Sequence, residues 1–155
     1  MFDAIGTLTD WWTPADAAAY KQRADKVAAL YAGYEPVPGH RINGRLTLGE
    51  NISDLSGLPI AFDALQAALA RDKAAGKPAA RIDGYTPEQR FFLSNAVVWR
   101  VKARDEAAIN QLRTDPHSPG KFRVRGPMSN SADFARAFEC GSGSAMVARE
   151  PLSVW

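Results

Sequence analysis

Two short segments, TPAD at residues 13–16 and TPEQ at residues 86–89, predict the starts of two helices. In each segment a threonine can cap the helix, a proline fits its first position, and Asp16 or Gln89 can complete a capping box. Ala, Leu, Glu, Lys, Arg and Gln dominate the chain, while runs of β-branched residues are scarce. The sequence therefore predicts a mainly α-helical fold.

The other helices are predicted from apolar spacing and turn-forming residues. The first helix continues on apolar positions three and four apart until the turn residues at 35–40. The second is expected from about Thr47 to Ala75, where Gly76 ends it, with a kink at Pro59. The third is expected to run from its threonine cap through residue 103.

The last third of the chain is predicted to be less regular. A shorter helix is expected over residues 105–115. Residues 116–130 hold three prolines and two glycines, which favour an ordered loop over a long helix. Asn130 and Asp133 are expected to cap a final short helix at 131–138, and the tail that follows is expected to be irregular.

The composition limits the possible classes of function. The chain has 155 residues, the size of one domain, and its 46% hydrophobic and 23% charged residues are ordinary for a globular protein. A formal net charge of +2 without a basic stripe argues against binding nucleic acid. No apolar run approaches the ~20 residues that a membrane span needs. With Cys140 as its only cysteine, the chain can form neither an internal disulfide nor a cysteine-rich zinc site.

Glu50 and Asp54 form the first candidate functional pair. They stand four residues apart in LTLGENISDLSGL, so both side chains project from the same helix face. A solvated acidic face is the simpler explanation. Their glycine and apolar neighbours indicate a partly buried helix, in which carboxylates need a metal, a cation or strong hydrogen bonds. One carboxylate could then bind zinc while the other orients a histidine ligand.

The segment TDPHSPGKFR supplies the second candidate pair, His117 and Arg123. His117 lies between two prolines that restrain its backbone, and it could donate a hydrogen bond to a developing oxyanion. A loop-capping role is the alternative. Arg123 could hold a carbonyl or a carboxylate through two parallel hydrogen bonds. On the third expected helix, Trp99 beside Val98 could line an apolar pocket.

Four segments of the chain carry a family resemblance. They are NGRLTLGENISDLSGL, FFLSNAVVWR, TDPHSPGKFRVRGPMSNSADFARAFEC and the closing VW. In this order they resemble the neprilysin family of zinc metallopeptidases, which includes endothelin-converting enzymes and bacterial oligopeptidases. The resemblance covers nearly the whole chain. It implies the helical C-terminal part of a thermolysin-like (gluzincin) catalytic domain.

The resemblance also implies roles for the candidate residues near the expected metal. Glu50 matches the family's third zinc ligand. Asp54 matches the carboxylate that orients a zinc-bound histidine. His117 matches the histidine that stabilises the tetrahedral intermediate of peptide hydrolysis.

Three further residues match substrate-binding positions of the family. Arg123 matches the arginine that binds a backbone carbonyl of the substrate. Val98 and Trp99 match the region that lines the pocket for the residue after the cut bond. The resemblance therefore implies peptide substrates, hydrolysed by zinc-activated water.

The family's remaining zinc ligands and its general base come from an H-E-x-x-H helix. This chain lacks that motif, and its only histidines are His40 and His117. Residues 1–155 are therefore expected to form a single partial domain that needs the missing N-terminal part of the enzyme. Alone, the chain is expected to be inactive and to bind zinc weakly or not at all. The family resemblance implies an extracytoplasmic location, although the chain itself shows no targeting signal.

Two further expectations concern partners. The face that holds Glu50 and Ile52 is expected to expose apolar area, so that the fragment dimerises or exchanges a terminal helix. The alternative to a peptidase is a non-catalytic helical module that binds a peptide or a protein through residues 117–123.

Overall fold

Helices make up most of the ordered backbone in this computed structural model, which describes residues 2–154. Within that range there are six helices, and extended pairing is limited to isolated β-bridges. In chain order the helices are α1 (Pro14–Ala32), α2 (Leu48–Ala74), α3 (Pro87–Val98), α4 (Asp105–Thr114), α5 (Gly120–Ser129) and α6 (Ala132–Ala137). The predicted mainly α-helical fold is confirmed.

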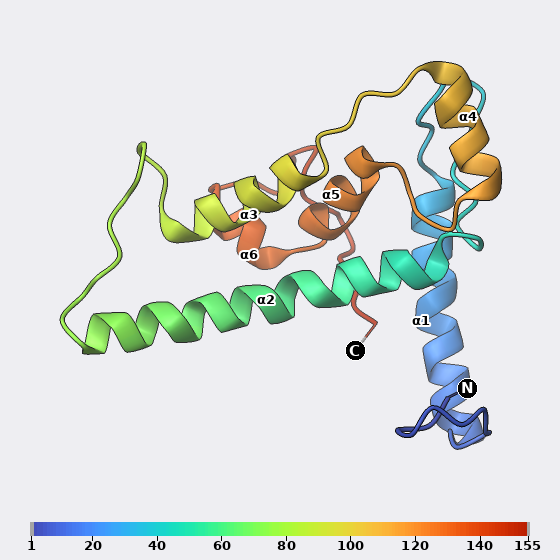
Figure 1. Cartoon of the computed structure of the whole chain (residues 1–155), viewed down its shortest axis with the longest axis horizontal. Coiled ribbons are helices and arrows are strands. Elements are labelled where there is room, and N and C mark those ends of the chain that lie inside the picture. The colour runs from blue at the N-terminus through green and yellow to red at the C-terminus, as the bar shows by residue number, and fades with distance from the viewer. Residues whose placement is uncertain (1, 155) are drawn as a thin grey trace.

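The 27-residue helix α2 is the element on which the others are arranged. Figure 1 shows α3, α5 and α6 along one side of α2, with α1 crossing near its start. The tail after α6 is irregular, as predicted, and returns to the helices through hydrogen bonds, one of them from the Ala148 N–H to the Ser129 carbonyl at 2.7 Å. The Leu152 N–H donates to Asn130 Oδ1 at 2.8 Å, and Arg23 Nη1 donates to the Val154 carbonyl at 2.9 Å.

Both predicted capping segments begin helices. At α1, the Asp16 N–H donates to Thr13 Oγ1 at 3.2 Å, and Pro14 is the first helical residue. At α3, the Gln89 N–H donates to Thr86 Oγ1 at 3.2 Å, while the Thr86 N–H donates back to Gln89 Oε1 at 3.0 Å. Because these bonds satisfy free N–H groups of the first turn, local sequence is enough to define both helix starts.

Helix α2 spans nearly the predicted range and ends before Gly76, whose φ of +73° suits glycine. Pro59 lies inside the helix, and the ribbon of α2 is continuous from end to end in Figure 1. The proline therefore does not interrupt α2. Its missing N–H removes one hydrogen bond, but the adjacent Leu58 and the nearby Phe62 pack this part of the helix into the core.

Helix α3 is shorter than predicted. It ends at Val98, and residues 100–104 have no regular structure, whereas the apolar spacing predicted helix through residue 103. The cause is a tertiary contact. The backbone at Gly120 approaches the Trp99 carbonyl so closely that a Cβ at Gly120 would lie 2.6 Å from that oxygen.

The predicted loop at residues 116–130 is wrong, because Gly120–Ser129 forms α5. Pro119 lies just outside the helix, where proline is tolerated, and Pro127 lies in its last turn. Phe122 and Met128 are almost fully buried, at 4% and 3% exposure. Their packing outweighs the local cost of the prolines and glycines.

The cap of the final helix also differs from the prediction. Ser131, and not Asn130, caps α6, since its Oγ accepts from the Phe134 N–H at 3.1 Å. Asn130 instead follows α5, and its Nδ2 donates to the Gly126 carbonyl at 2.8 Å. Because the unpredicted helix α5 ends at Ser129, Asn130 lies at the end of α5 and not at the start of α6.

Two apolar clusters hold the helices together. One joins α1, the start of α2 and α5, and its buried members are Ala24, Val27, Tyr31, Ile42, Ile52, Phe122 and Val154. The other joins α2, α3 and α5, and its buried members are Leu58, Phe62, Phe92 and Met128. The rings of Phe62 and Phe92 stack in the second cluster, with centroids 5.2 Å apart.

The apolar face expected around Glu50 is only partly present. Ile52 is 7% exposed and belongs to the first cluster, so it cannot offer the surface for self-association that was expected of it. Exposed apolar side chains lie elsewhere, at Ile60 on α2 and at Val97 and Val98 on α3. Among the described residues, no helix is long and apolar enough to cross a membrane.

Candidate functional site

The first two turns of α2 carry the carboxylates of the candidate site. Glu50 and Asp54 project from one face of the helix, as their spacing predicted, and both contact the same side chain of α5. They differ in exposure, because the side chain of Glu50 is 41% exposed and that of Asp54 is 17% exposed. Glu50 is thus open to a partner from solvent, whereas Asp54 is largely enclosed.

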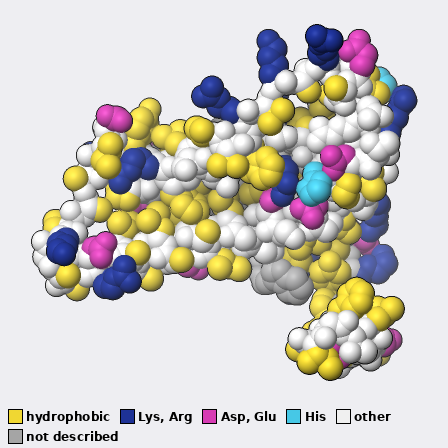
Figure 2. All heavy atoms as spheres, in the orientation of Figure 1, with side chains coloured by type: hydrophobic (Ala, Val, Ile, Leu, Met, Phe, Trp, Pro, Cys, Tyr) yellow, Lys and Arg dark blue, Asp and Glu magenta, His cyan; other side chains and the backbone are white. Residues whose placement is uncertain are grey.

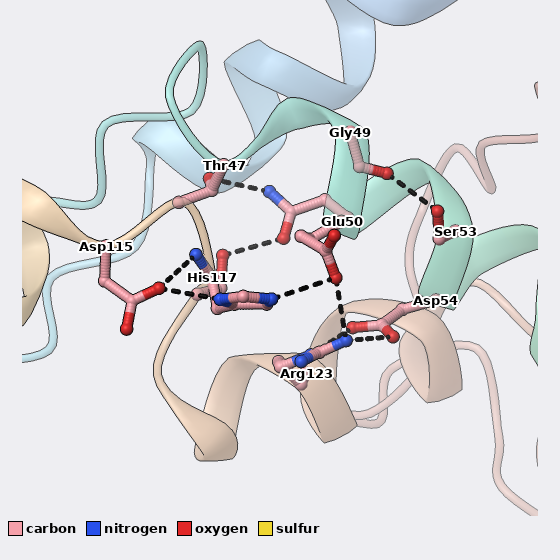
Figure 3. Close-up of polar contacts among 10 residues, drawn as sticks. Thr47, Gly49, Glu50, Ser53, Asp54, Asp115, His117 and Arg123 are labelled. Carbon is pink, nitrogen blue, oxygen red and sulfur yellow. Dashed lines mark hydrogen bonds and ion pairs between the residues drawn. The ribbon is translucent and has the colours of Figure 1, made fainter.

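Arg123 of α5 binds Asp54 through two parallel hydrogen bonds. Nε donates to Oδ2 at 2.7 Å and Nη2 donates to Oδ1 at 2.8 Å, while Nη2 also lies 3.5 Å from Glu50 Oε2 (Figure 3). The hydrogen bonds from Asp54 raise the pKa of the Arg123 guanidinium above its ordinary value. Such a two-point contact fixes the orientation of the arginine as well as its position.

The ring of Trp99 holds the other side of the same guanidinium. The central carbon of Arg123 lies 4.0 Å from the Trp99 ring centroid, a distance typical of a cation–π contact. Arg123 is therefore held between an acidic helix face and an aromatic ring. Its side chain is only 13% exposed, so its position in the site is well defined by these neighbours.

His117 lies between the carboxylates of Glu50 and Asp115, on the side of Glu50 away from Arg123. Its Nδ1 is 2.7 Å from Asp115 Oδ1, and its Nε2 is 3.3 Å from Glu50 Oε2 (Figure 3). The His117 backbone N–H also donates to Asp115 Oδ1, at 2.9 Å. These hydrogen bonds, led by the one from the backbone, hold the pKa of the Asp115 carboxyl below its ordinary value. Asp115 thus fixes both the backbone and the ring of His117.

A buried chain of hydrogen bonds connects the histidine segment to α2. Ser118 Oγ donates to Asn51 Oδ1 at 2.7 Å, Asn51 Nδ2 donates to Thr47 Oγ1 at 2.9 Å, and Thr47 Oγ1 donates to the Asn43 carbonyl at 3.1 Å. Asn51 and Ser118 are buried, at 0% and 1% exposure. The residues adjacent to Glu50 and His117 are therefore tied together in the protein interior.

Tyr31 of α1 packs beneath α5 at Gly126, one turn after Arg123. A Cβ on Gly126 would lie 2.1 Å from the Tyr31 hydroxyl, so only glycine permits this approach. Tyr31 is fully buried, and its hydroxyl has no hydrogen-bond partner among the described residues. Burial raises the pKa of the Tyr31 hydroxyl far above its ordinary value, and the charge of Asp54 adds to this effect.

A pocket of about 240 Å³ opens beside the guanidinium of Arg123, between α2, α3 and α5. Apolar and small side chains form much of its lining, including Leu58, Ala61, Phe91 and Trp99. The structure thus places Trp99 at this pocket, as the sequence suggested. Val98 is 71% exposed and lies outside the described lining of the pocket.

Sequence reasoning identified Glu50, Asp54, His117 and Arg123, and the structure brings these four side chains together. It missed Asp115, Asn51 and Ser118, which hold the histidine segment in place. The aspartate two residues before His117 was a usable signal, because aspartate often accepts hydrogen bonds from the backbone that follows it. The partnership of Asn51 with Ser118 spans 67 positions and has no local signal.

The side chains of this cluster offer few ligands for a metal ion. Glu50 offers a half-exposed carboxylate, and carboxylate oxygen is a suitable ligand for zinc. Asp54 has both oxygens engaged by Arg123. Over residues 2–154, no group of three or more His, Cys, Asp or Glu side chains is arranged to hold a metal. The described residues therefore fit a single metal ligand, Glu50, and not a complete site.

The chain is similar to known proteins over almost its entire length. The model of peptidase family M13 matches residues 1–154. Neprilysin-2 of Caenorhabditis elegans is 39% identical over 158 residues, which cover 100% of this chain and 21% of that protein. Endothelin-converting enzyme 1 of Cavia porcellus is 40% identical over 154 residues, which cover 99% of this chain and 20% of that protein.

The fold is also similar to that of solved zinc metalloproteases. The crystal structure of the Mycobacterium tuberculosis zinc metalloprotease Zmp1 in complex with an inhibitor matches with a TM-score of 0.88 and 38% identity, over 99% of this chain and 24% of that one. PepO from Lactobacillus rhamnosis matches with a TM-score of 0.80 and 32% identity, over 97% of this chain and 22% of that one. The chain spans about a fifth of the length of the curated relatives it matches.

Proposed function

The chain belongs to peptidase family M13, and on this basis we propose that it is the C-terminal part of a zinc-dependent metallopeptidase that hydrolyses peptide bonds. The observation that carries the proposal is the cluster of Glu50, Asp54, His117 and Arg123. Helix α2, the segment before α5 and α5 itself all contribute to it. In this proposal residues 1–155 form one partial domain.

Glu50 is proposed to be one zinc ligand. Its exposure and its position at the edge of the cluster support this role, because an ion could reach it without disturbing the Asp54–Arg123 pair. Zinc bound in such a peptidase site acts as a Lewis acid and activates water. The other ligands and the general base would come from an H-E-x-x-H helix in the remaining part of the enzyme.

His117 is proposed to stabilise the oxyanion that forms when a peptide carbonyl is attacked. In its protonated form, the ring donates to Asp115 from Nδ1 and directs Nε2–H toward the side of Glu50. A fixed donor next to the metal ligand is the arrangement that such stabilisation requires. The buried Ser118–Asn51 bond supports this role, because it limits the movement of the residue next to His117.

Asp54 and Arg123 are proposed to act as a linked pair. Asp54 would orient a histidine ligand of the metal, and Arg123 would donate to a backbone carbonyl of the peptide. Arg123 has five N–H donors, and the two that bind Asp54 leave others for a substrate. The pocket beside Arg123, with Trp99 in its wall, would then accept the side chain after the cut bond, whereas Val98 lies outside the described lining.

The proposed partners are peptide substrates and the N-terminal part of the same enzyme. Self-association of the fragment or exchange of a terminal helix is retained as a proposal, now through exposed side chains such as Ile60 and Val97. An extracytoplasmic location is proposed from family membership alone.

The experiment uses the protein encoded by the whole reading frame that contains this chain. Zinc content and peptide hydrolysis are measured for the wild type and for Glu50→Gln, His117→Gln and Glu106→Gln. Glu50→Gln is expected to lose zinc and activity, and His117→Gln to keep zinc while kcat falls about 10²–10³-fold. Glu106→Gln, an exposed carboxylate on α4, is the control and should change neither quantity.

Unchanged zinc content and activity in Glu50→Gln would contradict the ligand assignment. Absence of zinc and of hydrolysis in the wild-type protein would instead favour a non-catalytic helical module that binds peptides or proteins.

A further inference from the structure

A second pocket lies beside Trp99, on the outer side of α3 and α5. It has a volume of about 480 Å³, and its lining includes Trp99, Arg100, Val101, Lys102, Lys121 and Val124. Three of these residues are cations, and the described lining contains no carboxylate. The rest of the lining is apolar, so the pocket offers both positive charge and hydrophobic contact.

Close packing of two backbone segments creates this pocket. Gly120 allows the start of α5 to lie directly against the Trp99 carbonyl, because any Cβ there would come within 2.6 Å of that oxygen. Lys121 and Val124 on α5 are thereby brought beside the irregular segment 100–104 that follows α3. The pocket wall therefore depends on the same contact that ends α3 at Val98.

The three cations are exposed and available. Arg100, Lys102 and Lys121 all have exposed side chains. The ion pairs found within residues 2–154 involve none of them. Figure 2 shows Lys and Arg side chains projecting along the edge of the molecule over the segment between α3 and α4. Lys121 Nζ lies 5.8 Å from the Phe122 ring centroid, a contact that leaves its charge exposed. Grouped cations without ion-pair partners raise the local concentration of negatively charged ligands.

We propose that this pocket binds an acidic side chain or a terminal carboxylate of a peptide whose neighbouring apolar residue occupies the pocket beside Arg123. Trp99 lines both pockets, so one short peptide could reach both. This inference rests on the proposed peptidase function and adds a preference for acidic peptides to it. The apolar walls at Val101 and Val124 favour a peptide over a nucleic acid, whose backbone would need a longer basic stripe.

The test uses the 155-residue chain itself and measures binding without hydrolysis. The probes are the acidic peptide acetyl-Leu-Asp-Glu amide and its uncharged counterpart acetyl-Leu-Asn-Gln amide, titrated by calorimetry and by NMR of the tryptophan indole N–H signals. The acidic peptide is expected to bind about tenfold more tightly at low salt. This advantage should shrink when salt rises from about 0.02 to about 0.3 M, because the charges are exposed to solvent.

Two double variants with equal change in net charge separate a local site from a general effect. Lys102→Gln/Lys121→Gln removes two cations from the pocket, and the preference for the acidic peptide should fall from about tenfold to about twofold. Lys73→Gln/Lys77→Gln removes two cations near the far end of α2 and should keep the preference.

Three results would overturn the inference. They are equal or undetectable binding of both peptides, equal losses in the two double variants, or tighter binding of a single-stranded DNA oligonucleotide than of the acidic peptide. Since none of these measurements depends on zinc or on bond cleavage, failure of the acidic pocket and failure of the proposed peptidase function can be told apart.

Discussion

At the scale of single residues, the pairing of Arg123 with Asp54 decides the shape of the candidate site. Arg123 comes from α5 and Asp54 from α2, and they are 69 positions apart in the chain. Both side chains are largely buried and joined by two hydrogen bonds, while Glu50 and His117 are half-exposed beside them. The site therefore has an inner pair that provides structure and an outer pair that is accessible to a ligand.

Asp54→Asn is expected to lower the free energy of unfolding by about 1–3 kcal/mol, because it leaves the Arg123 charge largely enclosed with a weaker partner. Urea denaturation followed by circular dichroism measures this change. Glu50→Gln is the matched comparison and should cost less than about 1 kcal/mol, since Glu50 is 41% exposed and its contact with Arg123 is longer. Equal losses in the two variants would contradict the distinction between inner and outer pairs.

The carboxyl of Asp115 provides a prediction of pH dependence. Its pKa is lower in the folded protein than its ordinary value of 3.8, chiefly because it accepts a hydrogen bond from the His117 backbone. The ionised form thus stabilises the fold above that ordinary value, and the contribution is lost as pH falls through the lower, folded pKa. Asp115→Asn should therefore be less stable than wild type at pH 6, and the difference should shrink towards about pH 3. Thermal unfolding across this range would disagree if the difference stayed constant or grew on acidification.

The residues of the site divide by how far the sequence alone could identify them. Glu50, Asp54, His117 and Arg123 stand in segments whose chemistry and family resemblance marked them, and the structure brings them together. Tyr31, Asn51 and Ser118 are ordinary residues of helices and loops by sequence. They matter because they are buried against distant partners, which no local pattern encodes.

At the scale of elements, the approach of α5 to α1 is set by Gly126. Replacing this glycine by alanine would place a methyl group 2.1 Å from the Tyr31 hydroxyl. Gly126→Ala is expected to cost about 2–3 kcal/mol of stability and to loosen the Arg123–Asp54 pair, which lies one turn earlier on α5. Chemical denaturation gives the first quantity, and the NMR signal of the Arg123 Nε–H gives the second.

Gly57→Ala is the control for Gly126→Ala, because Gly57 is also helical but has open space around it. It should be neutral or stabilise the protein by up to about 1 kcal/mol, as expected for glycine replaced in an exposed helix. If both variants lost the same stability, the close contact with Tyr31 would not be the cause.

The helices differ in how well the sequence predicted them. Those that begin with a threonine and a proline, α1 and α3, have their starts determined by bonds within four residues. Helix α5 was predicted as a loop because its prolines and glycines are poor helix formers. It forms because Phe122 and Met128 enter two different clusters and because glycines permit close packing, effects that depend on the folded chain.

Considered as a whole, the molecule leaves one side of the candidate site open to solvent. Glu50 and His117 are half-exposed, and the pocket beside Arg123 is open, so further ligands and substrate could approach from outside this chain. The described residues hold no complete metal-binding group of their own. The proposed function accounts for this arrangement, because it assigns the chain one part of an active site that the rest of the enzyme completes; the chain spans about a fifth of the length of its curated relatives.

The isolated chain is therefore expected not to hydrolyse peptides, even with added zinc. In the proposed mechanism the general base comes from an H-E-x-x-H helix, a motif that this sequence lacks, and among the described residues one carboxylate provides too few ligands to hold the metal firmly. The measurement is cleavage of short fluorogenic peptides with and without zinc and a chelator. Robust cleavage that the chelator abolishes would show that the 155 residues contain a working site.

In the proposed function, Glu50 belongs to a zinc site completed by another part of the same enzyme. The most direct test of this assignment is the DNA sequence upstream of the Phe2 codon, read in frame. We expect an H-E-x-x-H motif within the segment that precedes this codon. An in-frame stop codon without such a motif would mean that no zinc helix precedes this chain, and the roles proposed for Glu50, Asp54 and His117 in hydrolysis would have to be abandoned.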